Sequence, residues 1–295
     1  MQNLVYKIVF NIAGISFSFY MPHEIFINES FQPFLGEKEA EDIQIWFHEE
    51  ENLNLTGKNP VTTKIPFRVY KDAQGFYRIF HDHKMLKDKP YAIGRVLSDT
   101  EELIQFLPES REFFSESHNT FSHIAFEELL ARYGAMILHA SFIDTEYGGI
   151  LFSGPSGVGK STQAELWCRY KKAEQINGDR PILKQERNEW KAYGSPYAGS
   201  SRCWVNKSTS IRAIVMLEQG NECRIWKLKK AEAFRKVYEN IIVNSWNDSY
   251  VEKITVLIEK LIMSVPVYHM ICTKNHNSVA ALEDILKGEN TDGSK

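Results

Sequence analysis

The chain has 295 residues, of which 43% are hydrophobic and 25% charged, with a formal net charge of −3. These values are typical of an ordinary soluble globular protein that is long enough for two domains or one large one. The charge gives no support for a nucleic-acid-binding protein, which usually carries a basic stripe. The sequence has no apolar run of about 20 residues, as a bilayer span requires, and residues 1–10 alternate rather than forming the apolar block of a signal peptide.

The cysteines and the overall character of the chain bear on its location. They are widely spaced and include no C-x-x-C pair, which predicts reduced thiols rather than a disulfide frame or a metal site. Their positions are Cys168, Cys203, Cys223 and Cys272. We therefore expect a cytoplasmic protein that binds neither nucleic acid nor membrane.

The first part of the chain is predicted to be rich in β-structure. Residues 4–20 alternate as a hairpin does, with Ala13-Gly14 near the turn. Further strands are predicted at 43–47, 67–70 and 76–80, with a turn at 72–75 and an exposed polar loop at 49–63. We expect residues 1–115 to form an antiparallel β-rich domain, for which substrate recognition is one candidate role.

From residue 116 onward, helices and strands alternate. A helix capped by Thr120 or Ser122 is predicted to end at Tyr133. Strands are predicted at 135–142, 149–152, just before 179, 211–217 and 265–272; helices are predicted at 162–170, 229–243, 248–263 and 278–286. This pattern indicates an α/β domain over residues 116–290, followed by a short tail, 291–295.

The most informative segment matches G-x-x-x-x-G-K-[ST] at every fixed position, between a predicted strand and a predicted helix. Glycines let successive backbone N–H groups point at phosphates, and the helix adds its positive end. Lys160 then reaches the β- and γ-phosphates, and the Ser161 hydroxyl can ligate Mg²⁺. The sequence thus predicts a site for ATP and Mg²⁺ made by Gly154, Pro155, Ser156, Gly157, Val158, Gly159, Lys160, Ser161 and Thr162. The alternative is a glycine-rich turn without a ligand.

Phosphate loops of this kind need a carboxylate that helps to hold the metal. Asp179, in Ile176-Asn177-Gly178-Asp179-Arg180-Pro181, is the best candidate. A plain turn before Pro181 explains the same residue equally well.

The order His139, then 154–161, then Asp179-Arg180 resembles the HPr kinase/phosphorylase family and, more distantly, ATP-dependent phosphoenolpyruvate carboxykinase. The resemblance covers roughly residues 120–290. It implies an α/β fold: a P-loop nucleotide domain of the HPr kinase/carboxykinase-like type, here preceded by a β-rich N-terminal domain. It also implies that Asp179 is the second residue of the family's acidic pair and binds the metal.

The chain departs from that family at Gly178, where the family has an acidic residue thought to act as the base toward the acceptor serine. This departure puts both HPr as the substrate and the phosphorylase reaction in doubt. The family signature is also not recognisable at 194–199. The sequence is closer in character to HPr-kinase-like proteins found beside peptide-modification genes, some of which look like peptide serine kinases.

Several other side chains are candidates for the chemistry, each with a structural alternative. His139 is a candidate base or a buried histidine at a strand end, and Asp144 is a weaker candidate or a turn former. Arg180 and Arg202 are candidate charge stabilisers or surface arginines, and segment 194–201 is a closing loop or an inert one. Glu218 could add to the metal shell or serve a turn, and the pair His81 and His83 could begin a metal site or lie in an exposed polar loop.

The sequence therefore predicts an ATP- and Mg²⁺-dependent kinase that transfers the γ-phosphoryl group to a hydroxyl acceptor, in a serine of a peptide or protein or in a small molecule. The predicted catalytic residues are Lys160, His139, Asp179 and Arg202, and the predicted metal ligands are Ser161 and Asp179. The alternative is a nucleotide-binding sensor or partner protein with weakened catalysis, which Gly178 favours. A carboxykinase needs a second metal and a basic cluster for a dicarboxylate, and no matching cluster is found. The sequence leaves open whether the chain forms a homo-oligomer.

Overall fold

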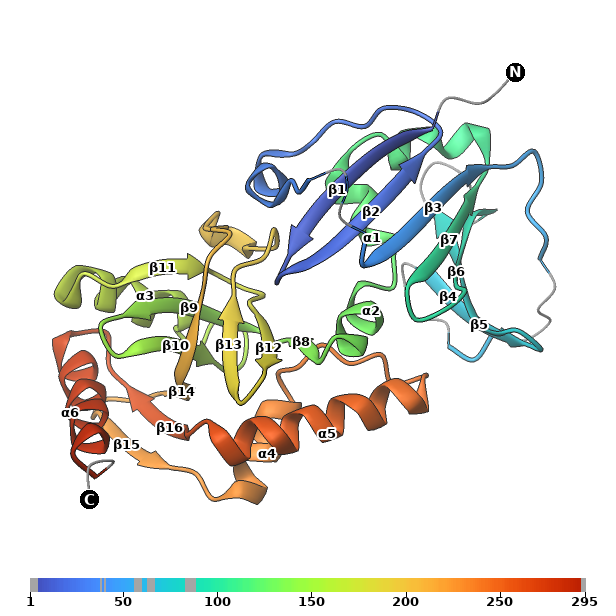
Figure 1. Cartoon of the computed structure of the whole chain (residues 1–295). Coiled ribbons are helices and arrows are strands. Elements are labelled where there is room, and N and C mark those ends of the chain that lie inside the picture. Colours follow the sequence, from blue (N-terminus) through green and yellow to red (C-terminus); the bar gives the residue numbers. More distant parts are fainter. Residues whose placement is uncertain are drawn as a thin grey trace. The chain divides into compact units, whose positions relative to one another are not determined.

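The computed structural model describes residues 5–37, 39, 41–55, 60–62, 67–82 and 89–292 (Figure 1). The chain forms two compact units, one of residues 1–133 and 244–251 and the other of residues 134–243 and 252–295. The first 115 residues and the residues up to Tyr133 thus belong to one unit, so the division lies later than the predicted 115/116 boundary. His83 of the sequence-predicted histidine pair lies outside the described residues.

The first unit contains a seven-stranded sheet in the order β1-β2-β3-β7-β6-β5-β4. Its strands are β1 (Tyr6–Ile12), β2 (Ile15–Met21), β3 (Ile43–Glu49), β4 (Phe67–Asp72), β5 (Gly75–Asp82), β6 (Lys89–Val96) and β7 (Glu101–Phe106). The hairpin at the start and the turn at 72–75 are as predicted. The expectation of an antiparallel sheet is wrong at its centre, because β2 pairs with β3 and β3 with β7 in parallel. Parallel neighbours cannot be joined by a tight turn, and the connection after β3 accordingly runs through β4, β5 and β6 before the chain returns as β7.

Short helices pack on this sheet: η1 (Glu29–Phe34), η2 (Pro108–Phe114), α1 (Ser117–Ser122) and α2 (Phe126–Arg132). The phenyl ring of Phe121 in α1 lies within 5.0 Å, centroid to centroid, of those of Phe10, Phe19 and Phe31. The helix predicted up to Tyr133 ends as expected, with Tyr133 as the C-cap of α2, but its predicted start at Thr120 or Ser122 is wrong, because the chain breaks between α1 and α2. The carboxylate of Glu102 on β7 accepts the Ala125 backbone N–H at 2.9 Å, so a sheet residue caps the second helix.

The second unit contains a nine-stranded sheet. Its strands are β8 (Ala135–Ile137), β9 (Ala140–Thr145), β10 (Gly148–Ser153), β11 (Glu174–Asn177), β12 (Ile182–Glu186), β13 (Glu189–Tyr193), β14 (Ser208–Gln219), β15 (Arg224–Lys227) and β16 (Val267–Cys272). Its helices are η3 (Gly199–Ser201), α3 (Lys160–Lys171), α4 (Lys230–Tyr238), α6 (His276–Asp292) and most of α5 (Asp248–Ser264). The unit is therefore of mixed α/β type.

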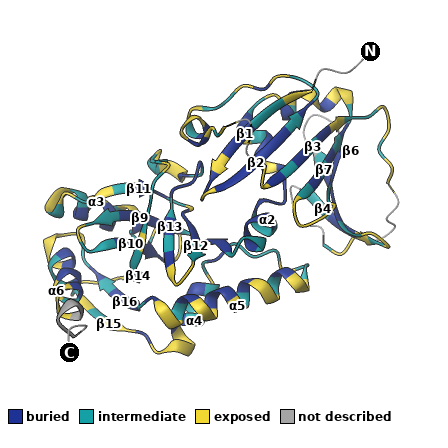
Figure 2. Cartoon of the chain, viewed as in Figure 1, coloured by how far each residue is buried: buried dark blue, intermediate teal, exposed yellow. Residues whose placement is uncertain are grey.

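The long strand β14 organises this sheet. It pairs in parallel with β10 on one side and β16 on the other, while its first residues pair antiparallel with β13. Helices α3 and α6 cover one face, where their apolar side chains and those of the strands form a buried core that includes Phe152, Val215, Trp167, Met270 and Leu282. Figure 2 shows the dark, buried residues concentrated along these strands.

One further expectation needs correction because it bears on the site. Residues 135–142 form two strands, β8 and β9, rather than one. Between the two strands, the backbone N–H of Leu138 donates to the Pro181 carbonyl and that of His139 to the Asn240 carbonyl, and Leu138 forms an isolated bridge with Ile241. None of the helices in the described part of the chain combines the length and apolar character that crossing a bilayer requires.

Candidate functional site

The glycine-rich loop, residues 154–159, connects the end of β10 to the start of α3. Gly154, Gly157 and Gly159 have φ angles of 140°, 78° and 110°, which residues with a Cβ rarely adopt. A Cβ at Gly154 would also lie 3.2 Å from the Leu217 carbonyl oxygen of β14. The glycines of the motif are therefore required by the path of the backbone.

Lys160 is the first residue of α3 and is buried, with 8% of its surface exposed. Its Nζ donates to the carbonyl oxygens of Gly154 at 3.0 Å and Pro155 at 3.2 Å, so the side chain folds back over the loop. Burial lowers the pKa of Lys160, and the negative charge of Asp179 opposes that shift. Ser161, the next residue, is exposed at the start of the helix.

His139 is brought to this loop by strand pairing. Ala140, the first residue of β9, is paired with Ser153, the last residue of β10. The Ser153 hydroxyl donates to the His139 carbonyl at 2.8 Å, and the Ala140 N–H donates to the Asp179 carbonyl at 3.0 Å. These bonds fix the backbone on both sides of the His139 side chain.

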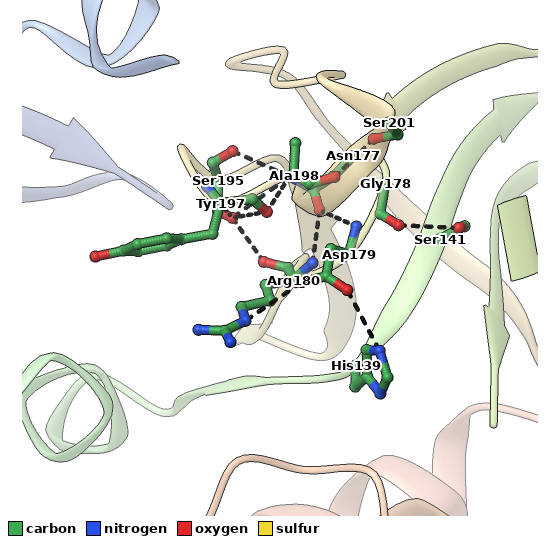
Figure 3. Close-up of polar contacts among 10 residues, drawn as sticks. All are labelled: His139, Ser141, Asn177, Gly178, Asp179, Arg180, Ser195, Tyr197, Ala198 and Ser201. Atoms are coloured by element: carbon green, nitrogen blue, oxygen red, sulfur yellow. Dashed lines mark hydrogen bonds and ion pairs between the residues drawn. The ribbon is translucent and has the colours of Figure 1, made fainter. Parts of the chain in front are cut away.

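His139, Asp179 and Arg180 form a polar cluster (Figure 3). The His139 Nε2 lies 3.3 Å from Asp179 Oδ1, and Arg180 Nε lies 3.4 Å from Asp179 Oδ2. The side chains of His139 and Asp179 are 35% and 28% exposed. Burial, and next the charge of Lys160, lower the pKa of His139, whereas Asp179 raises it. The imidazole is therefore neutral at pH 7 and bonded to a carboxylate.

Asn177 is a residue of the site that the sequence did not single out. It is fully buried, and its Oδ1 accepts the backbone N–H groups of Asp179 at 3.1 Å and Arg180 at 2.8 Å. Its Nδ2 donates to the carbonyls of Ser195 at 3.0 Å and Tyr197 at 3.2 Å. One amide side chain thus fixes the turn that carries Asp179 and ties it to segment 194–203 (Figure 3).

Gly178 is also held by this segment. A Cβ at position 178 would lie 1.7 Å from the Ser201 Oγ and 2.9 Å from the Ala198 carbonyl oxygen. The Ser201 hydroxyl donates to that same carbonyl at 2.7 Å, and the buried Ser141 hydroxyl donates to the Gly178 carbonyl at 3.1 Å. Ser201 therefore fills the space in which a side chain at 178 would begin, so an acidic residue cannot be accommodated there with the loop in this position.

The remaining candidates lie in different surroundings. Arg202 is exposed with a φ of 51°, and among the described residues it makes no ion pair with Asp179. Asp144 lies at the end of β9 remote from His139 and pairs with Lys207 at 2.8 Å, which argues against a role as a base. Glu218 bonds to His269 at 2.9 Å.

A metal ion bound with a nucleotide needs few protein ligands, since Mg²⁺ is commonly held by one or two carboxylates together with phosphate oxygens. Asp179 and Ser161 fit such a set, because the carboxylate is partly exposed and the hydroxyl is exposed. Within the described ranges, no group of three or more His, Cys, Asp or Glu side chains is arranged to hold a metal ion.

Comparisons with known proteins identify two similarities. The family described as "SynChlorMet cassette protein ScmC" matches residues 118–286. Among solved structures, the Hpr(Ser) kinase/phosphatase from Coxiella burnetii is similar over 54% of this chain and 99% of that one, with 14% sequence identity and a TM-score of 0.32. A search of curated proteins found no match.

Proposed function

This chain belongs to the SynChlorMet cassette protein ScmC family, and from its candidate site we propose that it is an ATP- and Mg²⁺-dependent kinase with a hydroxyl acceptor. The observation that carries the proposal is the position of Lys160. Its ammonium group lies over the glycine-rich loop and interacts electrostatically with both Asp179 and His139. A glycine-rich loop, a carboxylate and a titratable group thus lie together at one edge of the sheet, which supports phosphoryl transfer as the proposed reaction.

In this proposal the loop and Lys160 bind the nucleotide. Backbone N–H groups of residues 156–161 and the positive end of α3 would contact the phosphates. Lys160 would exchange its bonds to the Gly154 and Pro155 carbonyls for phosphate oxygens, which a charged donor binds more strongly. Bound Mg²⁺, held by Ser161 and Asp179, would neutralise phosphate charge.

The proton of the acceptor hydroxyl needs a destination, and His139 offers one. With Nε2–H donating to Asp179, the neutral imidazole presents Nδ1 as the acceptor. Asp179 holds the ring in that tautomer, and burial together with the charge of Lys160 lowers its pKa and so favours the neutral ring. Because the transition state is loose, positioning counts for more than basicity, so a weak base is sufficient. Arg180, beside the carboxylate, would interact with phosphoryl oxygens.

The proposal is tested with γ-labelled ATP, Mg²⁺ and an extract of the source organism, with label traced by size to protein, peptide or small-molecule fractions. We expect wild type to label one fraction and Lys160→Ala to label none. Lys171→Ala is the matched control, since Lys171 lies at the other end of α3 and pairs with Glu283 at 2.6 Å. Equal labelling by wild type and Lys160→Ala would rule out the mechanism.

A second candidate function is a nucleotide-binding sensor with weakened catalysis. The observation that favours it is Ser201, which occupies the space of an acidic side chain at 178. ATP binding by wild type without transfer of label to any fraction would support this alternative over the kinase.

A further inference from the structure

A second polar and aromatic cluster lies on neighbouring strands of the same sheet. Glu218 is near the end of β14, His269 is on β16 and Trp226 is on β15. The His269 Nε2 bonds to Glu218 Oε2 at 2.9 Å, and the rings of His269 and Trp226 are 4.6 Å apart, centroid to centroid. His269 is buried, with 5% of its surface exposed, whereas Trp226 is 43% exposed. The buried imidazole of His269 thus contacts two exposed side chains, the carboxylate of Glu218 and the indole of Trp226.

Strand register relates this cluster to the glycine-rich loop. Ser153, which precedes the loop, is paired with Met216, Met216 with His269, and His269 with Trp226. Directly paired residues point to the same face of a sheet, and three strand spacings amount to about 14 Å. The neighbours of these paired residues along the strands, such as Val215 and Met270, belong to the core under α3 and α6. The row of paired residues from Ser153 to Trp226 therefore points to the opposite face of the sheet.

The cluster and the His139–Asp179 pair flank the loop on opposite sides. His139 precedes β9, which pairs with one edge of β10, whereas β14 pairs with the other edge (Figure 1). The end of β14 also contacts the loop itself, since the Gln219 side-chain amide donates to the Gly157 carbonyl at 2.9 Å. A triphosphate bound on the loop with its γ-phosphate toward Asp179 therefore has its other end directed toward Glu218 and Trp226.

The chemistry of the two exposed groups suits a nucleoside. His269 engages one oxygen of the Glu218 carboxylate, and among the described residues the other oxygen, Oε1, has no hydrogen-bond partner. A carboxylate oxygen accepts hydrogen bonds from ribose hydroxyls, as the acidic residue of dinucleotide folds does. An exposed indole can stack on a base, and the Trp226 ring here packs against the buried imidazole with an angle of 42° between the two planes.

We propose that Glu218 and Trp226, supported by His269, form the nucleoside subsite, in which the carboxylate binds the ribose and the indole stacks on the base. This inference rests on the proposed nucleotide-binding function and assigns the part of the ligand that the glycine-rich loop does not contact. It also gives Glu218 a role other than the metal ligation that its place at a strand end suggested.

The test compares the binding of ATP with that of tripolyphosphate, both with Mg²⁺, by titration calorimetry. Tripolyphosphate carries the phosphates without the nucleoside. We expect Trp226→Ala to weaken ATP binding by about tenfold, the range of base–aromatic stacking, with tripolyphosphate binding unchanged. Glu218→Gln should weaken ATP binding by about fivefold, and Trp226→Phe should keep it within about twofold. Tyr170→Ala is the matched control, because Tyr170 is 44% exposed on α3 and is not part of the cluster.

The outcomes separate this inference from the proposed function. If wild type binds both ligands and Trp226→Ala changes neither, the subsite is overturned while nucleotide binding stands. If Trp226→Ala weakens both ligands equally, the subsite is also overturned, because a nucleoside contact cannot affect tripolyphosphate. If wild type binds neither ligand, the proposed function itself fails.

Discussion

Each of the two units contains a histidine with a lowered pKa beside an arginine–carboxylate pair, yet the two clusters differ in burial and in how fully they are bonded. In the first unit, Arg78 and Glu102 form a buried ion pair, and Glu102 also caps α2. In the second, Asp179 meets His139 and Arg180 at 3.3 and 3.4 Å with all three partly exposed. The first cluster holds elements together, whereas the second leaves its groups accessible to a ligand.

The buried cluster is built through the sheet. Gly94 on β6 lies between Arg78 on β5 and Ile104 on β7, and a Cβ at Gly94 would be 2.8 Å from the Arg78 guanidinium. Glycine therefore lets the arginine reach across a strand to Glu102. Burial raises the pKa of Glu102 to about 7 and lowers that of His123 to about 4.

His123 is fully bonded as a neutral ring. Its Nδ1–H donates to the Asn119 carbonyl at 2.7 Å, and its Nε2 accepts the Tyr91 hydroxyl at 2.8 Å. No ring atom remains for chemistry. His139, by contrast, uses only Nε2 in its bond to Asp179. Similar residue types thus serve stability in one unit and, as we propose, catalysis in the other.

The largest effect that tests this comparison is expected for Arg78→Ala. Removing the guanidinium leaves Glu102 buried without its cation, which costs about 3–5 kcal/mol of unfolding free energy. Arg180→Ala, in the exposed cluster, should cost less than about 1 kcal/mol. Urea unfolding measures both, and equal losses would show that the two clusters do not differ as described.

Asp179→Asn, in the exposed cluster, is expected to reduce activity rather than stability. We expect transfer activity to fall by about 100-fold and the Mg²⁺ requirement to rise, because a charged ligand becomes a neutral amide, with little change in Tm. Asp144→Asn, on the other end of the same strand pair, is the control and should retain activity. Unchanged Mg²⁺ dependence in Asp179→Asn would remove Asp179 from the proposed metal site.

Gly178→Ala tests the packing of the segment that carries Ser201. The added methyl group overlaps the Ser201 side chain, so we expect a loss of about 2 kcal/mol. Ser201→Gly in the same chain removes the overlapping Oγ and Cβ and should restore part of that loss. Thermal unfolding of the single and double variants measures it, and additive losses would contradict this packing.

The smallest effect concerns pH. His123 has a folded pKa of about 4, below the unfolded value of 6.5, so its contribution to stability is present above pH 6.5 and is lost as the pH falls toward 4. This amounts to about 1 kcal/mol between pH 7 and pH 5.5. It is measured as the difference between wild type and His123→Phe in unfolding curves at the two pH values, because Glu102, whose folded pKa of about 7 lies above its usual 4.5, gains stability over the same pH range. The same pH dependence in both proteins would contradict the assignment to His123. The rate of phosphoryl transfer should instead fall as the pH is lowered through the pKa of His139, which burial holds below its usual 6.5. If His139→Gln keeps the pH profile of wild type, His139 is excluded as the base.

The sequence predicted much of the proposed site because the informative residues are local or ordered along the chain. The glycine motif specified its loop, and a strand and a helix do flank it. His139 and Asp179 were singled out by their order relative to that motif, and the structure brings them together. Their roles in metal binding and proton transfer stay predictions, as does that of Arg202.

Other residues carried no such signal. Asn177 reads as an ordinary turn residue, and only the fold shows that its amide joins the turn at 179 to the carbonyls of Ser195 and Tyr197. The break between α1 and α2 was missed because its cap, Glu102, comes from a strand more than 20 residues earlier. Periodicity reports only neighbours in the chain, so a contact of this kind leaves no pattern.

By itself, the sequence determined the glycine-rich loop, the strand that enters it and the helix that leaves it, because positive φ angles and hydrophobic alternation are properties of short segments. Tertiary structure alone decided the parallel pairing at the centre of the first sheet, the filling of the space at Gly178 by Ser201, and the row from Ser153 to Trp226. Each of these depends on segments far apart in the chain that meet only when strand register and side-chain packing are fixed together.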